Sequence, residues 1–236
     1  MSVLLIDAGN TRLKWQLRSE GRVLETASSG YDGDVTEKLP QADKVVVASV
    51  GEHAALHHSL QRMFAPRLIW LSQPAADSAA FVHCYSDPAR LGVDRWLAML
   101  GARRHCTGAV MVADAGTALT VDLLTADNRH QGGYIVPGLR LGSDALFSNT
   151  GRVRAYVDEE SLNGTAPGQD TLSCVMAGMR RQAQALVAAV QADYPDYHLL
   201  VTGGDGRWLA QALAAGYVAD LVFDGMDSLC AGSFLA

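Results

Sequence analysis

Apolar and polar residues alternate with a period of two in two similar stretches of the chain. Residues 3–17 are VLLIDAGNTRLKWQL, and residues 110–124 are VMVADAGTALTVDLL. Each stretch starts with an apolar run, passes through Asp-Ala-Gly and continues with alternating positions, which is the pattern of a β-strand. Each stretch therefore predicts two strands joined by a tight turn.

The two stretches form an internal repeat. Asp7 aligns with Asp114 and Gly9 with Gly116, 107 positions apart in a chain of 236 residues. A repeat of nearly half the chain predicts two similar domains, each opened by the same hairpin. We expect the N-terminal domain to comprise residues 1–107 and the C-terminal domain residues 108–236.

Other apolar patterns predict alternating strands and helices, and hence an α/β fold. Further strands are expected at 44–50, 68–71 and 198–202, and helices at 53–64, 90–105, 171–193 and 207–214. Residues 148–170 have the composition of a loop. The apolar face expected on the longest helix consists of Leu172, Val175, Met179, Leu186 and Val190.

Composition and charge exclude several classes of protein. The hydrophobic fraction is 49% and the formal net charge is −6, with no basic run. Dominant disorder and general nucleic-acid binding are therefore not expected. No run approaches the roughly 20 apolar residues of a membrane helix, and the N-terminus predicts a buried strand instead of a signal peptide. Four scattered cysteines indicate free thiols and a cytoplasmic location.

The two Asp-x-Gly turns suggest phosphate binding. Glycine lets backbone amides approach an anion, and an aspartate at a strand end can hold a cation beside the phosphates. A single Asp-x-Gly is common in ordinary turns, but two copies in register favour a phosphate site. The P-loop and Rossmann glycine motifs do not occur in the sequence.

Two further segments carry candidate chemistry. Residues 201–205, VTGGD, end a predicted strand and precede a helix, where a nucleoside could lie. Asp94 stands near the start of a predicted helix, where it is either a surface charge favoured by the helix dipole or a general base. Arg95 beside it could anchor an anionic group of a substrate.

Five motifs occur together in the order found in type III pantothenate kinases, and on these motifs the chain resembles that family. Each motif is short, but together they span nearly the whole chain. They are DAGNT at 7–11, GVDR at 92–95, DAGTA at 114–118, GGYIVPGL at 132–139 and TGGD at 202–205.

The resemblance implies the acetate/sugar kinase–actin-like fold: two ribonuclease-H-like domains related by internal duplication, with a nucleotide cleft between them. It implies transfer of the γ-phosphate of ATP to the 4′-hydroxyl of pantothenate, the first step of coenzyme A synthesis. The expected partners are pantothenate, ATP and a second copy of the chain. The expected cofactors are Mg²⁺ and a monovalent cation, either K⁺ or NH₄⁺.

The resemblance also implies roles for individual residues. Asp94 would be the proton acceptor, and Asp114 a ligand of the monovalent cation. The expected ATP-binding residues are Asp7, Ala8, Gly9, Asn10, Thr11, Arg12, Leu13, Lys14 and Thr117. The expected pantothenate-binding residues are Tyr85, Gly92, Val93, Asp94, Arg95 and Thr171.

The chain departs from the family pattern at one position: Asp170 stands where Asn commonly precedes the threonine. The helix at 171–193 is either a subunit contact or packs only on its own sheet.

Two other functions remain open from the sequence. One is a phosphatase of the same superfamily, against which GVDR argues. The other is a non-catalytic regulatory or accessory protein, in which loss of at least one of Asp7, Asp94, Arg95 and Asp114 would be expected.

Overall fold

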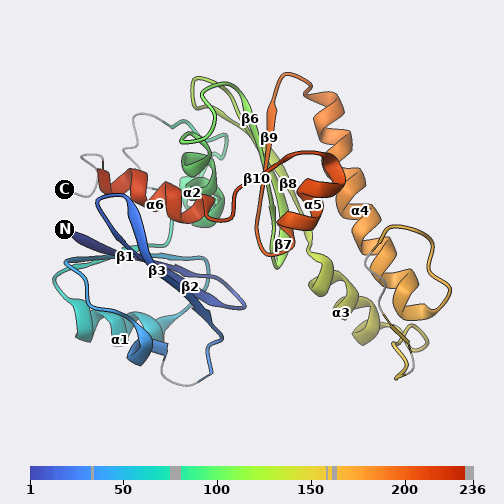
Figure 1. Cartoon of the computed structure of the whole chain (residues 1–236), viewed down its shortest axis with the longest axis horizontal. Helices are drawn as coiled ribbons and strands as arrows, with labels where there is room; N and C mark the ends of the chain where they lie inside the picture. The colour runs from blue at the N-terminus through green and yellow to red at the C-terminus, as the bar shows by residue number, and fades with distance from the viewer. Residues whose placement is uncertain (33–34, 75–80, 158, 161–163, 232–236) are drawn as a thin grey trace. The chain divides into compact units, whose positions relative to one another are not determined.

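The computed structural model describes residues 1–32, 35–74, 81–157, 159–160 and 164–231, and the chain forms two compact units (Figure 1). Unit 1 comprises Met1–Thr107 together with the residues from Asp220 onward, and unit 2 comprises Gly108–Ala219. The chain thus crosses from unit 1 to unit 2 after Thr107 and returns after Ala219. Each unit is described by itself below.

Unit 1 contains a five-stranded mixed sheet in the order β3-β2-β1-β4-β5. The predicted hairpin is present, because β1 pairs antiparallel with β2, and β2 pairs with β3 in the same way. The other two strands are parallel to β1. The strands are β1 (Ser2–Ala8), β2 (Leu13–Ser19), β3 (Arg22–Ser29), β4 (Lys44–Ser49) and β5 (Leu68–Leu71).

Helices cover both faces of this sheet (Figure 1). On one face, apolar side chains of β1, β2 and β4 pack against α1 (Ala54–Phe64). On the other face lie α2 (Val93–Ala102) and α6 (Leu221–Ala231). Two 3₁₀ turns, Val35–Lys38 and Pro88–Arg90, complete the regular structure of unit 1.

The C-terminal helix α6 packs in unit 1, although the sequence places it in the expected domain 108–236. It crosses α2 at two glycines: a Cβ on Gly101 would overlap the backbone of Leu221, and a Cβ on Gly225 would overlap the backbone of Leu97. This close approach lets the two backbones pack directly against each other. Local sequence patterns carry no signal of such a long-range return, so the expected domain boundary omits it.

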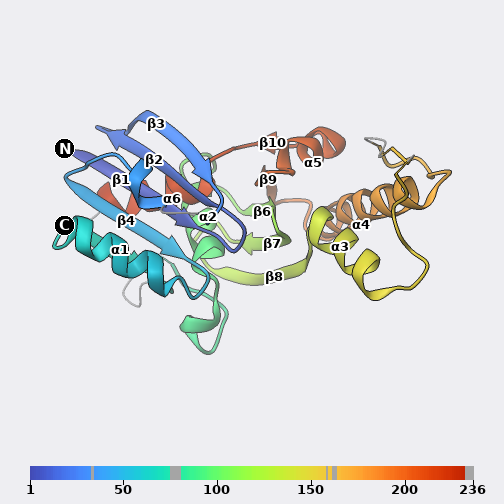
Figure 2. The same ribbon diagram turned by 90° about the horizontal axis from the view of Figure 1, so that it is seen from below.

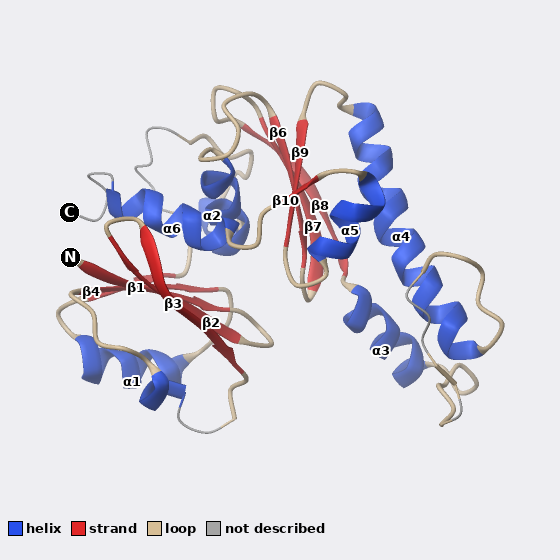
Figure 3. Ribbon diagram, viewed as in Figure 1, coloured by secondary structure: helices blue, strands red, loops and turns tan. Residues whose placement is uncertain are grey.

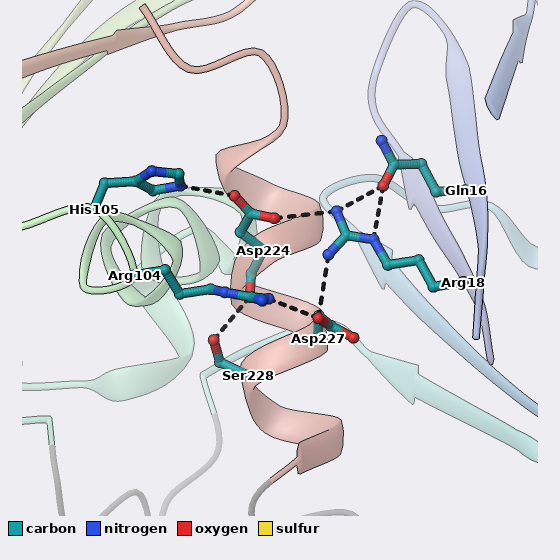
Figure 4. A network of polar contacts seen from close by, with 7 residues as sticks. All are labelled: Gln16, Arg18, Arg104, His105, Asp224, Asp227 and Ser228. Atoms are coloured by element: carbon teal, nitrogen blue, oxygen red, sulfur yellow. Dashed lines mark hydrogen bonds and ion pairs between the residues drawn. The ribbon is translucent and has the colours of Figure 1, made fainter. Parts of the chain in front are cut away.

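A polar network joins α6 to the sheet (Figure 4). The β2 residues Gln16 and Arg18 were expected on a polar strand face, but they are 1% and 4% exposed. The guanidinium of Arg18 lies 3.1 Å from Asp224 and 3.3 Å from Asp227, both on α6, and donates to Gln16. Arg18 can be buried because α6 supplies carboxylates to pair with its charge, and Gln16 is buried beside it as its hydrogen-bond acceptor.

Unit 2 repeats the strand arrangement of unit 1 (Figure 2). Its sheet has the order β10-β9-β6-β7-β8, with β6, β7 and β8 antiparallel and β9 and β10 parallel to β6. The predicted duplication and the predicted second hairpin are therefore confirmed. The strands are β6 (Val110–Ala115), β7 (Ala118–Leu124), β8 (His130–Pro137), β9 (His198–Thr202) and β10 (Gly216–Tyr217).

Three helices belong to unit 2 (Figure 3). The side chains of α4 (Thr171–Asp193) and α5 (Gly206–Leu213) pack on the sheet through Val187, Val190 and Leu209. The third helix, α3 (Leu139–Asn149), contacts α4, with Met179 close to Gly142. Among the described residues, no helix is long and apolar enough to cross a membrane.

The predicted elements are present with small shifts of their ends, and α4, β5 and β9 have the expected bounds. The expected loop 148–170 begins at the end of α3, and its residues 158 and 161–163 lie outside the described part of the chain. The elements β3, β8, β10, α3 and α6 are absent from the sequence expectations. In β3 nearly every side chain is exposed, so no apolar alternation marks it.

Candidate active site

The first phosphate turn lies between β1 and β2. The Gly9 N–H donates to the Arg12 carbonyl at 3.2 Å and closes the turn. The strand register places Asp7, near the end of β1, opposite Lys14 on β2. Asn10 and Thr11, at the tip, are exposed. The turn therefore presents polar side chains and a lysine at one edge of the sheet.

Asp7 lies in a distinctive electrostatic environment. Burial raises its pKa to about 6, with Lys14 acting to lower it and Asp94 to raise it further. The sequence-predicted residues Asp7, Lys14 and Asp94 are thus brought within electrostatic reach of one another. A cation bound beside Asp7 would favour its ionised form, because opposite charge offsets the desolvation cost.

Asp94 lies in the first turn of α2, two positions after Gly92, the residue that caps the helix. One carboxylate oxygen of Asp94 accepts the Arg95 N–H at 2.8 Å. A Cβ on Gly92 would stand 2.6 Å from that oxygen. Gly92 is therefore the residue that leaves room for the Asp94 carboxylate.

Arg95 and Tyr85 form a second contact at this helix start. The Arg95 guanidinium donates to the Tyr85 hydroxyl at 2.9 Å, and its carbon lies 5.9 Å from the centre of the Tyr85 ring. Arg95 is only 7% exposed. A guanidinium fixed in this way is suited to hold a carboxylate, because its planar fork matches the geometry of that anion.

The second turn lies between β6 and β7 in unit 2. The Gly116 N–H donates to the Ala118 carbonyl at 3.0 Å, as Gly9 does in the first turn. Asp114, near the end of β6, corresponds to Asp7, and Thr117 at the tip is exposed. The two aspartates therefore occupy matching positions in the two units.

Two further motifs converge on the second turn. Gly203 has φ +91°, and a Cβ there would overlap the Asp114 carboxylate and the Ala115 carbonyl. Since a side chain is disfavoured both by this conformation and by this contact, the position requires glycine. Gly138 donates to the Thr117 carbonyl at 3.0 Å. The VPGL and TGGD segments thus surround the Asp114 turn.

The residues present fit the cations expected of a kinase site. Among the described residues, no cluster of three or more His, Cys, Asp or Glu side chains could hold a metal by itself. Mg²⁺ needs only one or two protein carboxylates beside the phosphates of a substrate, and Asp7 and Asp94 are carboxylates within electrostatic reach of each other. Around Gly203, the oxygens of Asp114 and Ala115 lie close together, and hard cations prefer such oxygen ligands.

Thr171 is the first residue of α4, and its helix start is capped twice. The Asp170 carboxylate accepts the Ser173 N–H at 2.7 Å, and this hydrogen bond holds its pKa below the usual value. The Glu159 carboxylate accepts the N–H groups of Thr171 and Leu172 at 3.3 and 3.1 Å. Asp170, which departs from the family pattern, therefore serves as an effective helix cap.

The expected apolar face of α4 is confirmed in part, because Val190 is buried and Leu186 packs against the core of unit 2, whereas Leu172, Val175 and Met179 are only half-buried. Its buried residues are Ser173, Ala177, Arg180, Val187 and Val190, and of these only Val190 was expected. Helical spacing of 173, 177 and 180 is the signal that could have identified this face.

Two adjacent arginines of α4, Arg180 and Arg181, lie in different environments. Arg180 is only 7% exposed, whereas Arg181 is exposed. Burial raises the pKa of Asp205, and the Arg180 charge acts against that rise. The acidic residue of the TGGD motif is therefore electrostatically coupled to α4.

Comparison with known proteins identifies the family. The model of the type III pantothenate kinase family matches residues 3–193. The chain belongs to this family. A type III pantothenate kinase from Marinobacter nauticus is 35% identical over 250 residues, covering 99% of this chain and all of the relative. One from Pseudomonas fluorescens strain Pf0-1 is 34% identical, covering 97% and 98%.

Solved structures support the fold class. A Campylobacter jejuni structure described as a Baf-family transcriptional activator superposes with a TM-score of 0.67 at 25% identity, covering 97% of each chain. A 2-dehydro-3-deoxygalactonokinase-like structure from Sinorhizobium meliloti has a TM-score of 0.59 at 14% identity, covering 96% of this chain and 97% of that one. The predicted actin-like α/β fold is confirmed. The family match favours a kinase over the phosphatase and regulatory alternatives.

Proposed function

We propose that this kinase transfers the γ-phosphate of ATP to the 4′-hydroxyl of pantothenate, with Asp94 as the proton acceptor. The observation that carries the proposal is the arrangement at the start of α2. There the Asp94 carboxylate interacts electrostatically with Asp7 of the first phosphate turn, while Arg95 reaches Tyr85. A base, a phosphate-binding turn and an anion anchor thus belong to one unit.

The proposed reaction needs little covalent chemistry from the protein. The 4′-hydroxyl oxygen attacks the γ-phosphorus, the bond to the β–γ bridging oxygen breaks, ADP leaves, and Asp94 accepts the hydroxyl proton. In such reactions the protein mainly positions the reactants and stabilises charge. The Arg95 N–H bond to one Asp94 oxygen orients the carboxylate for this role.

The substrate-binding residues are proposed from the family motifs and their local geometry. Residues 7–14 and Thr117 would bind the ATP phosphates, and the TGGD segment would receive the nucleoside. Arg95, fixed by Tyr85, would bind the pantothenate carboxylate, with Gly92, Val93 and Thr171 as further contacts. The buried Arg180 near Asp205 would stabilise the nucleoside-binding segment.

The proposed cofactors are Mg²⁺ beside Asp7 and a monovalent cation, K⁺ or NH₄⁺, beside Asp114. When bound, these cations would neutralise the charge of the phosphates. The close approach of the Asp114 and Ala115 oxygens around Gly203 supports the second site. Membership of a kinase family, together with the Asp7 and Asp94 carboxylates within electrostatic reach of each other, supports the first site.

A coupled ADP-release assay with pantothenate, ATP and Mg²⁺ tests both the kinase activity and its requirement for a monovalent cation. We expect pantothenate-dependent turnover in K⁺ that falls sharply when Na⁺ replaces K⁺, and Asp114→Asn should abolish this difference. Turnover equal in the two salts would remove the proposed role of Asp114. Absence of pantothenate-dependent ADP release in both salts would contradict the kinase assignment.

We propose that the enzyme is a cytoplasmic homodimer. Apolar side chains of unit 2 are exposed on β8 and α3: Tyr134 at 42%, Ile135 at 60% and Leu141 at 47%. Exposed apolar surface is a feature of many subunit contacts. All four cysteines are free thiols, which fits a reducing compartment. Light scattering after gel filtration should give about twice the 25.1 kDa chain mass, and a monomer mass would contradict the dimer.

A further inference from the structure

Tyr31, just after β3, contacts the first phosphate turn from outside the DAGNT motif. Its hydroxyl donates a 2.6 Å hydrogen bond to the Gly9 carbonyl. Its ring stacks on His53 with centroids 4.7 Å apart and planes at 20°, and the His53 Nε2 lies 3.4 Å from the hydroxyl. Tyr31 thus links the turn to the residue that precedes α1.

The hydrogen bond determines the direction of a backbone amide. Because a trans peptide unit is planar, the Gly9 carbonyl and the Asn10 N–H point in opposite directions. With the carbonyl bound to Tyr31, the Asn10 N–H points away from Tyr31. If the peptide rotated, its carbonyl dipole would take the place of this donor, and a carbonyl oxygen repels a phosphate.

The Tyr31 hydroxyl remains a donor over the physiological pH range. Burial and then the negative charge of Asp7 raise the pKa of Tyr31 to about 12. The influence of Asp7 also shows that the tyrosine lies close to the charged part of the turn. Its hydroxyl therefore stays protonated while Asp7 is ionised.

Packing and directional contacts together orient the tyrosine ring. Tyr31 is partly buried against the hydrophobic core of unit 1 and borders a pocket of about 500 Å³ that is also lined by Thr36, His53 and Leu56. The hydrogen bond to Gly9 and the stacking on His53 are the directional contacts that orient it.

We propose that Tyr31 is a positioning residue for ATP, which holds the Gly9–Asn10 peptide with its N–H directed toward the phosphates. The inference rests on the proposed phosphate-binding role of residues 7–14. It adds a residue that the family motifs do not contain, 22 positions beyond the glycine that it contacts.

A second tyrosine, Tyr217 in unit 2, makes a similar hydrogen bond to a glycine carbonyl, that of Gly203 in the TGGD segment. The Tyr217 hydroxyl donates to the Gly203 carbonyl, but at 3.3 Å, and that carbonyl also accepts the Gly206 N–H at 3.1 Å. Loss of the Tyr217 hydroxyl would therefore leave Gly203 with a donor. Tyr217→Phe is therefore expected to raise the KM for ATP less than Tyr31→Phe does.

The test is Tyr31→Phe, which removes the hydroxyl and keeps the ring. We expect the Kd and the KM for MgATP to rise about three- to tenfold, which corresponds to the loss of one hydrogen bond. The KM for pantothenate and the kcat at saturating ATP should not change. Tyr217→Phe should raise the KM for ATP by less, and Tyr197→Phe, whose ring packs on Tyr194, should have no effect.

Other outcomes would overturn the inference. An unchanged Kd for MgATP in Tyr31→Phe would do so directly. Equal changes in both KM values together with a lowered melting temperature would indicate a general structural role instead. Lys14→Met separates the two proposals. If neither Lys14→Met nor Tyr31→Phe changes ATP binding, the phosphate-binding role of residues 7–14 fails. If Lys14→Met weakens ATP binding and Tyr31→Phe does not, only the role of Tyr31 fails.

Discussion

Replacing Asp94 by asparagine is expected to lower kcat by about 10²- to 10⁴-fold, the usual contribution of a general base. Asparagine keeps the shape of the side chain and can still accept the Arg95 N–H, but its amide cannot take the proton of the substrate hydroxyl. ATP should still bind, because residues 7–14 are unchanged. Steady-state kinetics and equilibrium titration with MgATP measure the two effects separately.

Two further variants sharpen this experiment. Asp43→Asn makes the same chemical change at an exposed aspartate that bonds Ser2, and it should leave kcat unchanged. Gly92→Ala keeps the carboxylate but places a methyl group 2.6 Å from its present position. A displaced base should lower kcat by about tenfold or more. Asp94→Asn turnover close to that of the parent enzyme would rule out Asp94 as the proton acceptor.

The sequence is most informative where structure is local. The hairpins at Asp7 and Asp114 follow from the alternation of apolar and polar residues on either side of each turn, and the structure contains both. Asp94 could be placed at a helix start because the apolar spacing begins just before it. In these cases the relevant residues are neighbours in the chain.

The sequence is least informative where distant segments meet. Glu159 caps α4 from 12 positions before Thr171, and a charged loop gives no hint of that partner. The buried Arg180 lies near enough to Asp205, 25 positions along the chain, for its charge to oppose the rise in the pKa of that carboxyl. Tyr31 contacts Gly9 across 22 positions. Pairings of this kind depend on the tertiary fold, so composition and periodicity cannot reveal them.

The network between β2 and α6 has the largest expected effect on stability (Figure 4). Arg18 pairs with both Asp224 and Asp227, and each carboxylate has a second partner, His105 for Asp224 and Arg104 for Asp227. Arg18 is the buried member, with 5% of its side chain exposed, whereas Arg104 is 42% exposed. Removal of one partner from a buried ion pair is strongly destabilising, because it leaves a poorly solvated charge.

Arg18→Met is therefore expected to lower the free energy of unfolding by about 3 kcal/mol and the melting temperature by about 6 to 12 °C. Methionine preserves most of the buried volume, so the loss reports on charge and hydrogen bonding. Arg104→Met removes the exposed partner of the same carboxylate, Asp227, and should cost about 1 kcal/mol or less. Urea and thermal unfolding of the full chain measure both changes.

The network also bears on catalysis, because Arg104 and His105 lie just after α2, the helix whose first turn contains Asp94. They bind Asp227 and Asp224 of α6, and Arg18 ties the same carboxylates to β2. Arg18→Met should therefore lower kcat as well as stability, since α2 loses part of its anchor to the sheet. An Arg18→Met enzyme as stable as the parent would show that Arg104 and His105 alone satisfy both carboxylates. The buried guanidinium would then be dispensable for holding α6 in unit 1.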